Sequence, residues 1–392
     1  MKTRPFLSHR RADRAQVVAL KQVLALYGVG GWRDLDDLHV GELAQPGFER
    51  AINDITGGLL WYGTKRVLGS WYVNNVELPA AIARKRRERD YPLVPLFVTV
   101  RPSEASAALL RATREPGADL TADDHKLFFE ANGWTRDRGE GLEAYRVDVA
   151  RRYVRAAVKS LSKGTYTVAV TALTEPAGTQ DFTFDWRALL NPRTRVLSAG
   201  AEAAMRDAAL VFRDAIKPTA EFPQVTIDFD APLPIASLLG YEWRVTSRLK
   251  LSIRQRTRSG IIVVHGDGHA ADGWPEWSED KTGGDSGCVI AVATTGSSLA
   301  GPLVQYARQV HAARTYELHV PRELDAAGMR GLARYVAAKL REVGCGNGQM
   351  HLLLAGPCAL AALVGAAANA AGPVIVPLWN GSSYGSAITL GG

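Results

Sequence analysis

The sequence predicts an α/β protein whose domains are built on parallel β-sheets. Short apolar runs alternate with helices that are apolar on one face, an order that gives parallel strands joined by crossover helices. Two similar nonapeptides lie far apart in the second part of the chain, which indicates an internal duplication. A length of 392 residues exceeds what one ordinary core needs and fits two domains, one of them duplicated.

The first domain is expected to span residues 1–163, where a break at Lys163-Gly164 follows the last helix. Its expected strands are residues 4–8, 57–63 and 92–98, and its expected helices are residues 13–27, a segment through Glu77 and Ala83, and residues 141–162. Residues 102–140 are richer in charge and glycine and are expected to decorate this domain. In a doubly wound sheet of this kind, ligands bind at the carboxyl ends of the strands.

The second domain is expected to consist of two similar α/β halves, residues 164–284 and 285–392, with a ligand groove between them. The segments Pro232–Gly240 and Pro357–Gly365 share Pro, Ala, Leu and Gly in register, and each follows a strand-like run. In both segments the proline is expected to open a helix at its first turn.

Composition restricts the class of protein and its partners. With 46% hydrophobic and 22% charged residues the chain should fold throughout, and its net charge of +7 favours anionic partners. Three cysteines without a CxxC pair argue against a disulfide framework or a zinc module. Residues 352–379 carry no charge, but glycine and proline divide them into strand and helix lengths. We therefore expect a cytoplasmic protein without a signal peptide or a membrane partner.

Polar and aromatic groups follow the expected strands and helices of the first domain. They are Ser8-His9-Arg10-Arg11, the loop Gly31–Leu38, the pair Ser70-Trp71, and Glu77. Hydroxyl and guanidinium groups at strand ends can bind a phosphate or a ribose. A lone glutamate on a helix is most often solvated, so Glu77 is a candidate only because of its place in this pattern.

At these residues the sequence resembles a TIR domain of the NAD-hydrolysing kind. The similar segments are Phe6–Arg11 (opening strand and arginine loop), Trp32–Glu42 (BB loop), Ser70–Leu78 (serine, tryptophan and glutamate helix) and Leu93–Phe97 (next strand). One position departs from the family pattern, because Val73 stands where a tryptophan often precedes the catalytic glutamate by four residues.

The resemblance implies NAD+ hydrolysis with Glu77 as the catalytic residue. The ribose–nicotinamide bond breaks with a neutral leaving group, so one carboxylate that stabilises an oxocarbenium-like cation is sufficient. NAD+ is then the substrate, the products are nicotinamide and ADP-ribose or a cyclic form, and no cofactor or metal is expected. The expected substrate-binding residues, with a tryptophan on a ring and an arginine on the pyrophosphate, are Ser8, Arg10, Trp32, Arg33, Asp37 and Trp71.

The second domain carries groups suited to phosphates and bases. Two turns before expected helices offer hydroxyls and backbone amides to a phosphate. A terminal segment can stack on and read a base, and one face of an expected strand is basic. The residues are Thr295, Gly296, Ser297 and Ser298; Gly356 and Pro357; Trp379, Asn380 and Tyr384; and Arg248 and Lys250. Each group also has a simpler role, as a helix cap, as packing or as a solvated strand face.

These segments resemble a SAVED domain, the bacterial relative of paired CARF folds that binds cyclic oligonucleotides. With the first domain, the chain resembles a TIR-SAVED fusion, an antiviral effector of the CBASS kind. The resemblance implies activation by a cyclic oligonucleotide, for which a cyclic trinucleotide such as cyclic tri-adenylate is the expectation. It also implies ligand-driven, head-to-tail self-association into an oligomer or filament that completes the TIR site.

Two other functions stay open. The first domain is alternatively a non-catalytic TIR adaptor that assembles when a nucleotide binds, or the whole chain is a basic nucleic-acid-binding protein, although we expect no nucleic-acid partner. Consumption of NAD+ distinguishes an NAD-hydrolysing first domain from a non-catalytic adaptor. Salt-sensitive binding of random duplex DNA would support the interpretation as a nucleic-acid-binding protein.

Overall fold

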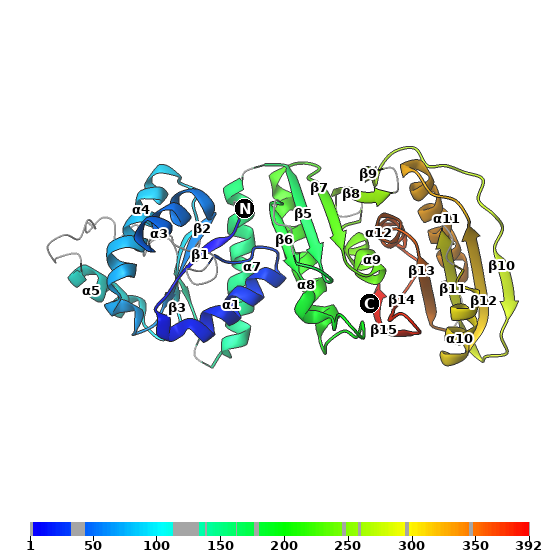
Figure 1. Ribbon diagram of the computed structural model, residues 1–392, viewed down its shortest axis with the longest axis horizontal. Helices are drawn as coiled ribbons and strands as arrows, with labels where there is room; N and C mark the ends of the chain where they lie inside the picture. The colour runs from blue at the N-terminus through cyan, green and yellow to red at the C-terminus, as the bar shows by residue number, and fades with distance from the viewer. Residues whose placement is uncertain are drawn as a thin grey trace. The chain divides into compact units, whose positions relative to one another are not determined.

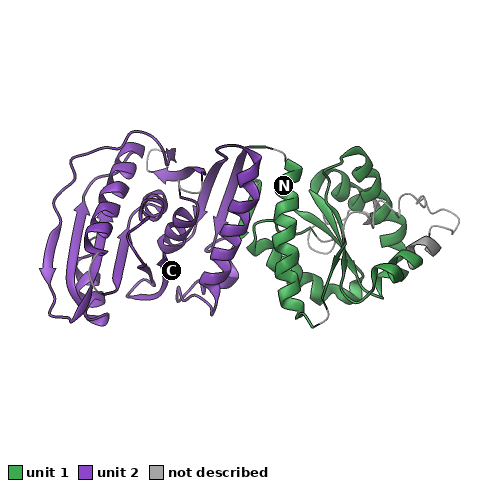
Figure 2. Ribbon diagram, turned by 180° about the vertical axis from the view of Figure 1, so that it is seen from behind, with its two compact units in different colours: residues 1–163, 178–184 green, residues 164–177, 185–392 purple. Residues whose placement is uncertain are grey.

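The chain divides into two compact units, which Figure 2 shows in different colours. Unit 1 comprises residues 1–163 and 178–184, and unit 2 comprises residues 164–177 and 185–392. The computed structural model describes residues 3–32, 44–112, 133–137, 139–161, 163–175, 180–244, 248–257, 260–294, 298–344 and 348–391. No helix in these ranges is long and apolar enough to cross a membrane.

Unit 1 is a parallel sheet with helices packed against it (Figure 1). Its strands are β1 (Pro5–Ser8), β2 (Gly58–Gly63), β3 (Leu93–Phe97) and β4 (Trp134–Thr135). Its helices are α1 (Arg14–Leu26), α3 (Ala44–Arg50), α4 (Leu78–Arg87), α5 (Pro102–Ala112) and α7 (Leu142–Leu161). Short helical turns are η1 (Arg11–Asp13), η2 (Ala51–Ile55), η3 (Val67–Gly69) and η4 (Val73–Glu77).

The strands of unit 1 are those of a sheet covered on both faces. Every residue of β1, β2 and β3 is buried, as expected for parallel strands between helix layers. Gly28, at a φ of +88°, follows α1 in the left-handed conformation that ends many helices. The expected continuous helix through Glu77 is instead a π-helical turn, η4, followed by α4. Such turns widen a helix locally and occur often at functional sites.

One residue outside the named strands, Trp32, pairs with the edge of the sheet of unit 1. The sheet runs β1-β2-β3-β4, and Trp32 forms a parallel bridge with Phe6 of β1. Leu7 N donates to Trp32 O at 3.0 Å, and Trp32 N donates to Pro5 O at 2.8 Å. Because β2 pairs with the other edge of β1, Trp32 occupies the place of a second strand. Counted in this way, the order is the doubly wound 2-1-3-4-5, with its switch point between β1 and β2.

Unit 2 contains two sheets with helices against them (Figure 1). In the first are β5 (Thr165–Thr171), β7 (Gln224–Asp230), β8 (Lys250–Thr257) and β9 (Gly260–His265), and β6 (Phe182–Asp185) lies where the chain passes between the units. The second contains β10 (Ser278–Lys281), β11 (Ser286–Thr294), β12 (Ala312–Val320), β13 (Met350–Ala355), β14 (Val374–Trp379) and β15 (Tyr384–Leu390). The helices are α8 (Ala201–Ile216), α9 (Leu233–Glu242), α10 (Ala300–Gln309), α11 (Ala326–Gly344) and α12 (Cys358–Ala367), with short turns η5 (Arg187–Leu189) and η6 (Lys217–Thr219).

The topology of unit 2 repeats. In the first sheet β5, β7 and β8 are parallel neighbours and β9 closes the series antiparallel. In the second sheet β11, β13 and β14 follow the same order and β15 closes it antiparallel. β10 precedes residue 285 but pairs with β12 in the second sheet, so the sheets divide the chain between His265 and Ser278 rather than at 284.

The two nonapeptides form equivalent helices, α9 and α12, which cross in close contact. Their prolines stand at the N-caps, one residue before the first helical turn in which we expected them. A Cβ on Gly240 would lie 1.8 Å from Ala362 O, and a Cβ on Gly365 would lie 2.0 Å from Ser237 O. In the register of the repeat, Ser237 and Ala362 are equivalent, so each glycine contacts the same position of the other helix. Glycine at the end of both nonapeptides therefore permits this crossing.

Candidate functional site

Two pockets lie at the carboxyl edge of the second sheet of unit 2. Pocket A has a volume of about 610 Å³ and is lined in part by Gln255, Arg256, Thr257, Thr294, Arg322 and Pro357. Pocket B has a volume of about 520 Å³ and is lined in part by Arg195, Pro232, Ser298, Ala355, Trp379 and Tyr384. The strands β11, β13 and β14 end at Thr294, Ala355 and Trp379. This is where an α/β sheet usually binds its ligands.

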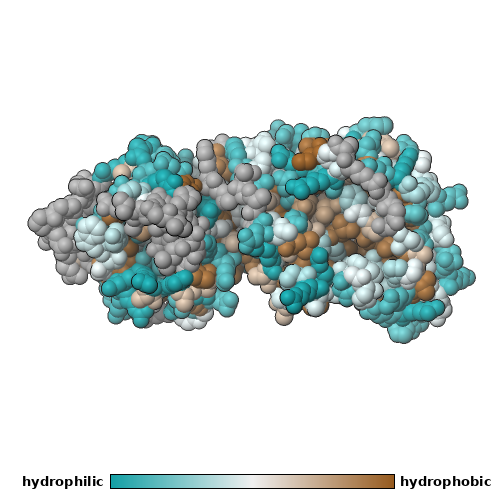
Figure 3. All heavy atoms as spheres, viewed as in Figure 1, coloured by the Kyte–Doolittle hydropathy of each residue, from teal (hydrophilic) through white to brown (hydrophobic). Residues whose placement is uncertain are grey.

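Apolar side chains reach the surface beside these pockets. In the space-filling view they gather over α9 and α12, among polar residues (Figure 3). Both helices are apolar on most of their circumference, and almost every residue of α9 is buried. Leu233 and Pro234 from the first turn of α9 contribute to pocket B. These two residues give pocket B an apolar wall against which the flat face of a base can pack.

Trp379 is the aromatic group that pocket B offers to a ligand. Its side chain is 41% exposed, and its ring lies 4.9 Å from the ring of Tyr384 at an angle of 59°. Tyr384 is only 6% exposed, and burial raises its pKa to about 12. It packs against Tyr306, whose hydroxyl lies 3.0 Å from His351 Nδ1. Tyr384 therefore supports Trp379 from below and presents little surface of its own.

Asn380 organises the turn between β14 and β15. Its Oδ1 accepts hydrogen bonds from the backbone N of Ser382 at 2.9 Å and of Ser383 at 2.8 Å. Its Nδ2 donates to Ser383 Oγ at 3.1 Å. The side-chain amide that we expected to read a base is thus engaged within the turn, and its role is to hold Trp379 in place.

Arg256 and Arg322 are the arginines that line pocket A. Arg256 is the second-to-last residue of β8, and Arg322 lies in the loop that follows β12. The guanidinium of Arg322 lies 5.3 Å from the centroid of the Trp274 ring. Gln255 Oε1 accepts a hydrogen bond from Ala359 N at 3.1 Å. One amide of the first turn of α12 is therefore already satisfied by the other half of unit 2. The turn at Gly356-Pro357 therefore has one backbone amide fewer with which to bind a phosphate.

The other expected phosphate turn is only partly described. Thr295, Gly296 and Ser297 lie outside the described residues. Ser298 Oγ accepts from Ala300 N at 3.4 Å, a local contact at the start of α10. Gly356 is required where it stands, because a Cβ there would lie 2.7 Å from Thr294 Oγ1. This end of β13 thus approaches β11 closely.

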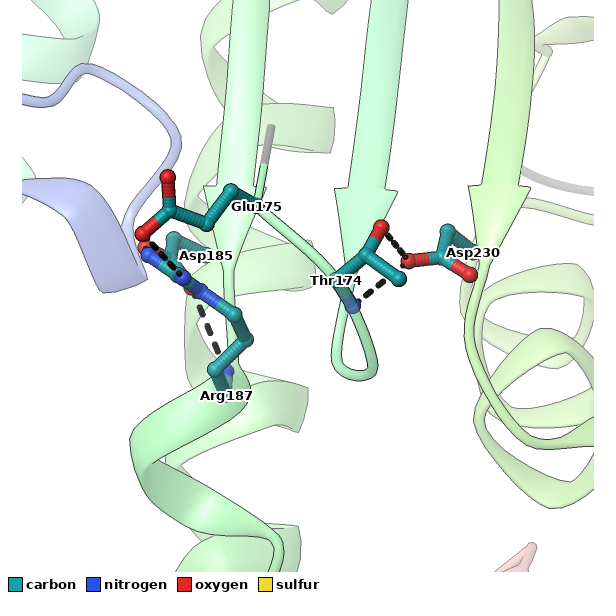
Figure 4. A network of polar contacts seen from close by, with 5 residues as sticks. All are labelled: Thr174, Glu175, Asp185, Arg187 and Asp230. Atoms are coloured by element: carbon teal, nitrogen blue, oxygen red, sulfur yellow. Dashed lines mark hydrogen bonds and ion pairs between the residues drawn. The ribbon is translucent and has the colours of Figure 1, made fainter. Parts of the chain in front are cut away.

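The carboxyl edge of the first sheet is acidic (Figure 4). Thr174 N donates to Asp230 Oδ2 at 2.8 Å, where β7 ends. Arg187 donates to Asp185 through Nε and Nη2, both at 2.9 Å, and its Nη1 lies 3.3 Å from Glu175 Oε1. In the register of the nonapeptides, Ala355 replaces Asp230. The halves have therefore diverged, and phosphates fit better beside the second half, where the equivalent carboxylate is missing.

Arg248 and Lys250 are not brought together with the other expected nucleotide-binding residues. They line pocket C, a separate cavity of about 310 Å³ that also includes Phe222, Arg330, Arg334 and Leu363. Lys250 begins β8, whereas Gln255–Thr257 of pocket A end it. A strand rises about 3.3 Å per residue, so the two ends of β8 lie about 20 Å apart. The structure therefore does not bring all of these residues into one pocket, because the pattern of a strand face does not tell which other residues lie at each end of the strand.

In unit 1, two loops meet at the switch point between β1 and β2. Arg10 Nη1 donates to Arg66 O at 3.0 Å, and Arg66 Nη1 donates to Ala12 O at 3.3 Å. Thr64 Oγ1 donates to the buried Asp13 Oδ2 at 2.7 Å, and Arg66 Nη1 lies 3.6 Å from Asp13 Oδ1. These contacts fix Arg10 beside the segment that leads to Ser70 and Glu77.

The remaining expected NAD+ site residues lie in different environments. Glu77 is 6% exposed at the end of η4, and Trp71 is 61% exposed two residues before that turn begins. Ser8 is fully buried, and its Oγ has no hydrogen-bond partner among the described residues. Arg33 and Asp37 lie outside the described residues. The structure thus brings Arg10 close to the Glu77 segment but does not show a complete pocket around it.

Trp32 is a core residue rather than an exposed ring of a ligand loop. It is 2% exposed, its ring is stacked on Phe6 with centroids 4.8 Å apart, and it meets Phe48 edge-on at 6.4 Å. The expectation that it stacks on the substrate is therefore not met in this structure. Trp71, which is 61% exposed, is the tryptophan of unit 1 whose ring is accessible for stacking on a substrate.

Replacing Trp32 with alanine should destabilise unit 1 by about 3–5 kcal/mol, the usual cost of truncating a buried aromatic side chain. Trp71→Ala is the matched control, because a side chain that is 61% exposed should change the free energy of unfolding by no more than about 0.5 kcal/mol. Denaturant unfolding of the intact chain, followed by tryptophan fluorescence and circular dichroism, measures both. Equal unfolding midpoints for the two variants would contradict the core position of Trp32.

Several residues of the pockets escaped the sequence prediction. Arg195, at a φ of +55°, and Arg322 lie in loops without a motif, and Arg256 belongs to the basic face of β8 beyond the part that we singled out. A usable signal was the alternation along β8, which continues from Arg254 to Arg256. For the two loop arginines the sequence carried no signal, because only the sheet order brings them to the same edge.

A family model matches part of unit 2, and a solved structure is similar over most of the chain. Residues 210–390 match the SAVED family model, described as the SMODS-associated and fused to various effectors sensor domain. The Acinetobacter baumannii Cap4 SAVED/CARF-domain containing receptor with the cyclic trinucleotide 2'3'3'-cAAA is similar at a TM-score of 0.50 and 12% identity, over 89% of this chain and 86% of that one. The Moraxella osloensis Cap4 receptor aligns at a TM-score of 0.46 and 10% identity, over the same shares of the two chains. No curated protein sequence matches.

Proposed function

We propose that unit 2, whose residues 210–390 match the SAVED sensor family, binds a cyclic oligonucleotide in pockets A and B and thereby switches on NAD+ cleavage by unit 1. The observation that carries the proposal is the pair of large pockets at the carboxyl edge of the second sheet of unit 2, with an exposed tryptophan in one and two arginines in the other. The relative of shared fold that holds 2'3'3'-cAAA supports a cyclic trinucleotide as the ligand.

Recognition follows from the chemistry of the two pockets. Trp379 provides the exposed ring on which a base stacks, and stacking of this kind tolerates any base. Arg256 and Arg322 provide charge-assisted hydrogen bonds to phosphate oxygens. A cyclic trinucleotide has three bases and three phosphates, so it can use both pockets at once.

Trp379→Ala should weaken cyclic trinucleotide binding by about 5- to 150-fold, the equivalent of one lost base stack. Titration calorimetry with 2'3'3'-cAAA and 3'3'3'-cAAA measures the change. Ile261→Ala is the control, because Ile261 is 65% exposed on β9 and lines none of the three pockets. An unchanged dissociation constant for Trp379→Ala would remove pocket B from the site.

For unit 1, the proposal rests on the TIR resemblance and on the strand order. The order 2-1-3-4-5 is that of flavodoxin-like sheets, which bind ligands at the switch point between the first and third strands. Here Ser8, Arg10 and Arg66 gather at that point. The hydroxyl of Ser8, which has no partner among the residues that the structure describes, supports a ligand there, because a buried polar group without a partner costs about 1–3 kcal/mol.

Glu77 then stabilises the cation that forms as nicotinamide leaves. The carboxylate is nearly shielded from water, which strengthens its interaction with a positive charge. The neutral leaving group needs no proton from the protein, and water attacks the ribosyl cation to give ADP-ribose. Trp71 is the exposed ring beside this segment that can stack on nicotinamide or adenine.

Nicotinamide release by the intact chain tests the proposal, measured with NAD+ in the presence and absence of cyclic di- and trinucleotides. Release that depends on one of these ligands is the expected result. A second candidate is a non-catalytic adaptor in which unit 1 only assembles. It is favoured by the burial of Trp32, which removes an expected NAD+ contact, and it predicts ligand binding without consumption of NAD+.

Activity should rise steeply with protein concentration when the ligand is saturating. TIR resemblance implies that a neighbour's loop completes the site, and bringing copies together raises its effective concentration. Head-to-tail contacts that do not close into a ring give filaments. Light scattering and nicotinamide release should appear together on adding ligand. Full activity in a strictly monomeric, ligand-bound protein would rule out this mode of activation.

A further inference from the structure

Pocket C combines a positively charged rim with an apolar floor. Lys250 begins β8, Arg248 lies two residues before it, and Arg330 and Arg334 come from one face of α11. One carboxylate, Asp267, also lines the cavity. None of the four cations forms an ion pair with a described residue, so the cavity carries excess positive charge.

The guanidinium groups of α11 are held in place by backbone oxygens. Arg330 Nε donates to His269 O at 2.6 Å and its Nη1 donates to His265 O at 3.3 Å, while Arg334 Nη2 donates to Gly268 O at 3.4 Å. Carbonyl oxygens orient a guanidinium without neutralising it. The arginines are therefore positioned in advance, with their charge available to an anion.

The floor and one wall of the cavity suit a flat, apolar group. Leu363 and two alanines from the last turns of α12 lie beneath it, together with Leu251 of β8. Phe222 is 49% exposed, and Lys250 Nζ lies 5.6 Å from the centroid of its ring. An exposed phenylalanine beside cations that form no ion pair with a described residue offers a surface on which a base can stack next to a phosphate.

We propose that pocket C is a second ligand site, for a nucleoside monophosphate, separate from the cyclic oligonucleotide site. Its volume of about 310 Å³ is about half that of pocket A and lies at the small end of ligand cavities. A cyclic trinucleotide does not fit such a space, whereas one base, one sugar and one phosphate do. The phosphate meets the arginines of α11 and Lys250, and the base lies against Phe222 and the apolar floor.

The experiment is equilibrium dialysis of the intact chain against labelled AMP, with adenosine and inorganic phosphate as competitors. One AMP per chain should bind, and saturating 2'3'3'-cAAA should not displace it. Adenosine and phosphate should each compete at least about tenfold more weakly than AMP, because each lacks one half of the contacts. Binding should also weaken as the salt concentration rises.

Lys250→Gln and Arg334→Gln should each weaken AMP binding by about tenfold or more, the effect of removing one charged hydrogen bond. Arg256→Gln, in pocket A, is the matched control and should leave AMP binding unchanged. Circular dichroism and the thermal midpoint verify that each variant is folded. The proposal is overturned by no binding at millimolar AMP, by displacement with 2'3'3'-cAAA, or by phosphate competing as well as AMP. None of these readouts depends on NAD+ cleavage or on pockets A and B.

Discussion

Glu77→Gln should lower ligand-stimulated nicotinamide release by at least about a hundred-fold, because a preorganised group that stabilises transition-state charge contributes about that much or more. Glutamine keeps the size and shape of the side chain but removes the negative charge. That charge acts on the ribosyl cation, which exists only near the transition state, so the affinity for NAD+ should change much less than the rate. Cyclic nucleotide binding should not change, since Glu77 lies in unit 1.

Steady-state nicotinamide release at saturating ligand measures this effect. Glu143→Gln on α7 is the matched control, because that glutamate is exposed and should keep full activity. Near-normal turnover by a folded Glu77→Gln protein would show that another group stabilises the cation. A loss of cyclic nucleotide binding in the same variant would instead indicate a general folding defect.

Gly240→Ala and Gly365→Ala should each destabilise unit 2 by about 3 kcal/mol or more, at the upper end of the range for overpacked cores. The added Cβ would lie 1.8 Å from Ala362 O or 2.0 Å from Ser237 O. Both obstacles are backbone atoms of a packed helix, which cannot rotate away as a flexible side chain can. The helices α9 and α12 must therefore separate, and the pockets at their N-terminal ends should lose their shape together.

Thermal unfolding and titration with 2'3'3'-cAAA measure both consequences. Gly301→Ala in α10 is the matched control, because a Cβ there meets nothing within 4 Å and the helix gains about 0.5–1 kcal/mol from the exchange. Wild-type stability of Gly240→Ala would show that the crossing of α9 and α12 is loose. It would also weaken the explanation of the repeated nonapeptide.

Elements with a strong local pattern were predictable from the sequence. The apolar runs at β1, β2 and β3 and the helix α7 have their predicted type, with bounds within a few residues. The predicted duplication depended on one pair of nonapeptides, and both sheets contain three parallel neighbouring strands followed by one antiparallel strand. Periodicity and repeats are local signals, and tertiary packing preserved them here.

The side-chain environment of single residues was harder to predict from the sequence. Trp32 follows a glycine-rich loop, and a short polar stretch follows it, so its pairing with Phe6 across the sheet was invisible in the chain. Lys250 lies on β8 as predicted, whereas Arg248 precedes the strand, and the sequence did not tell that both lie at the end of β8 opposite Arg256. Pairing between strands far apart in the chain determines the burial of Trp32 and which residues meet at each end of β8. A single sequence does not reveal that pairing.

The most direct test of the central proposal compares two curves in the same solution. One is the binding of a cyclic trinucleotide, followed through the fluorescence of the intact chain, and the other is the rate of nicotinamide release at each ligand concentration. If unit 2 senses the ligand and unit 1 cleaves NAD+ in response, the rate rises with occupancy and both curves shift together in Trp379→Ala. Saturated binding without nicotinamide release, or release that is already maximal before ligand is added, would contradict it.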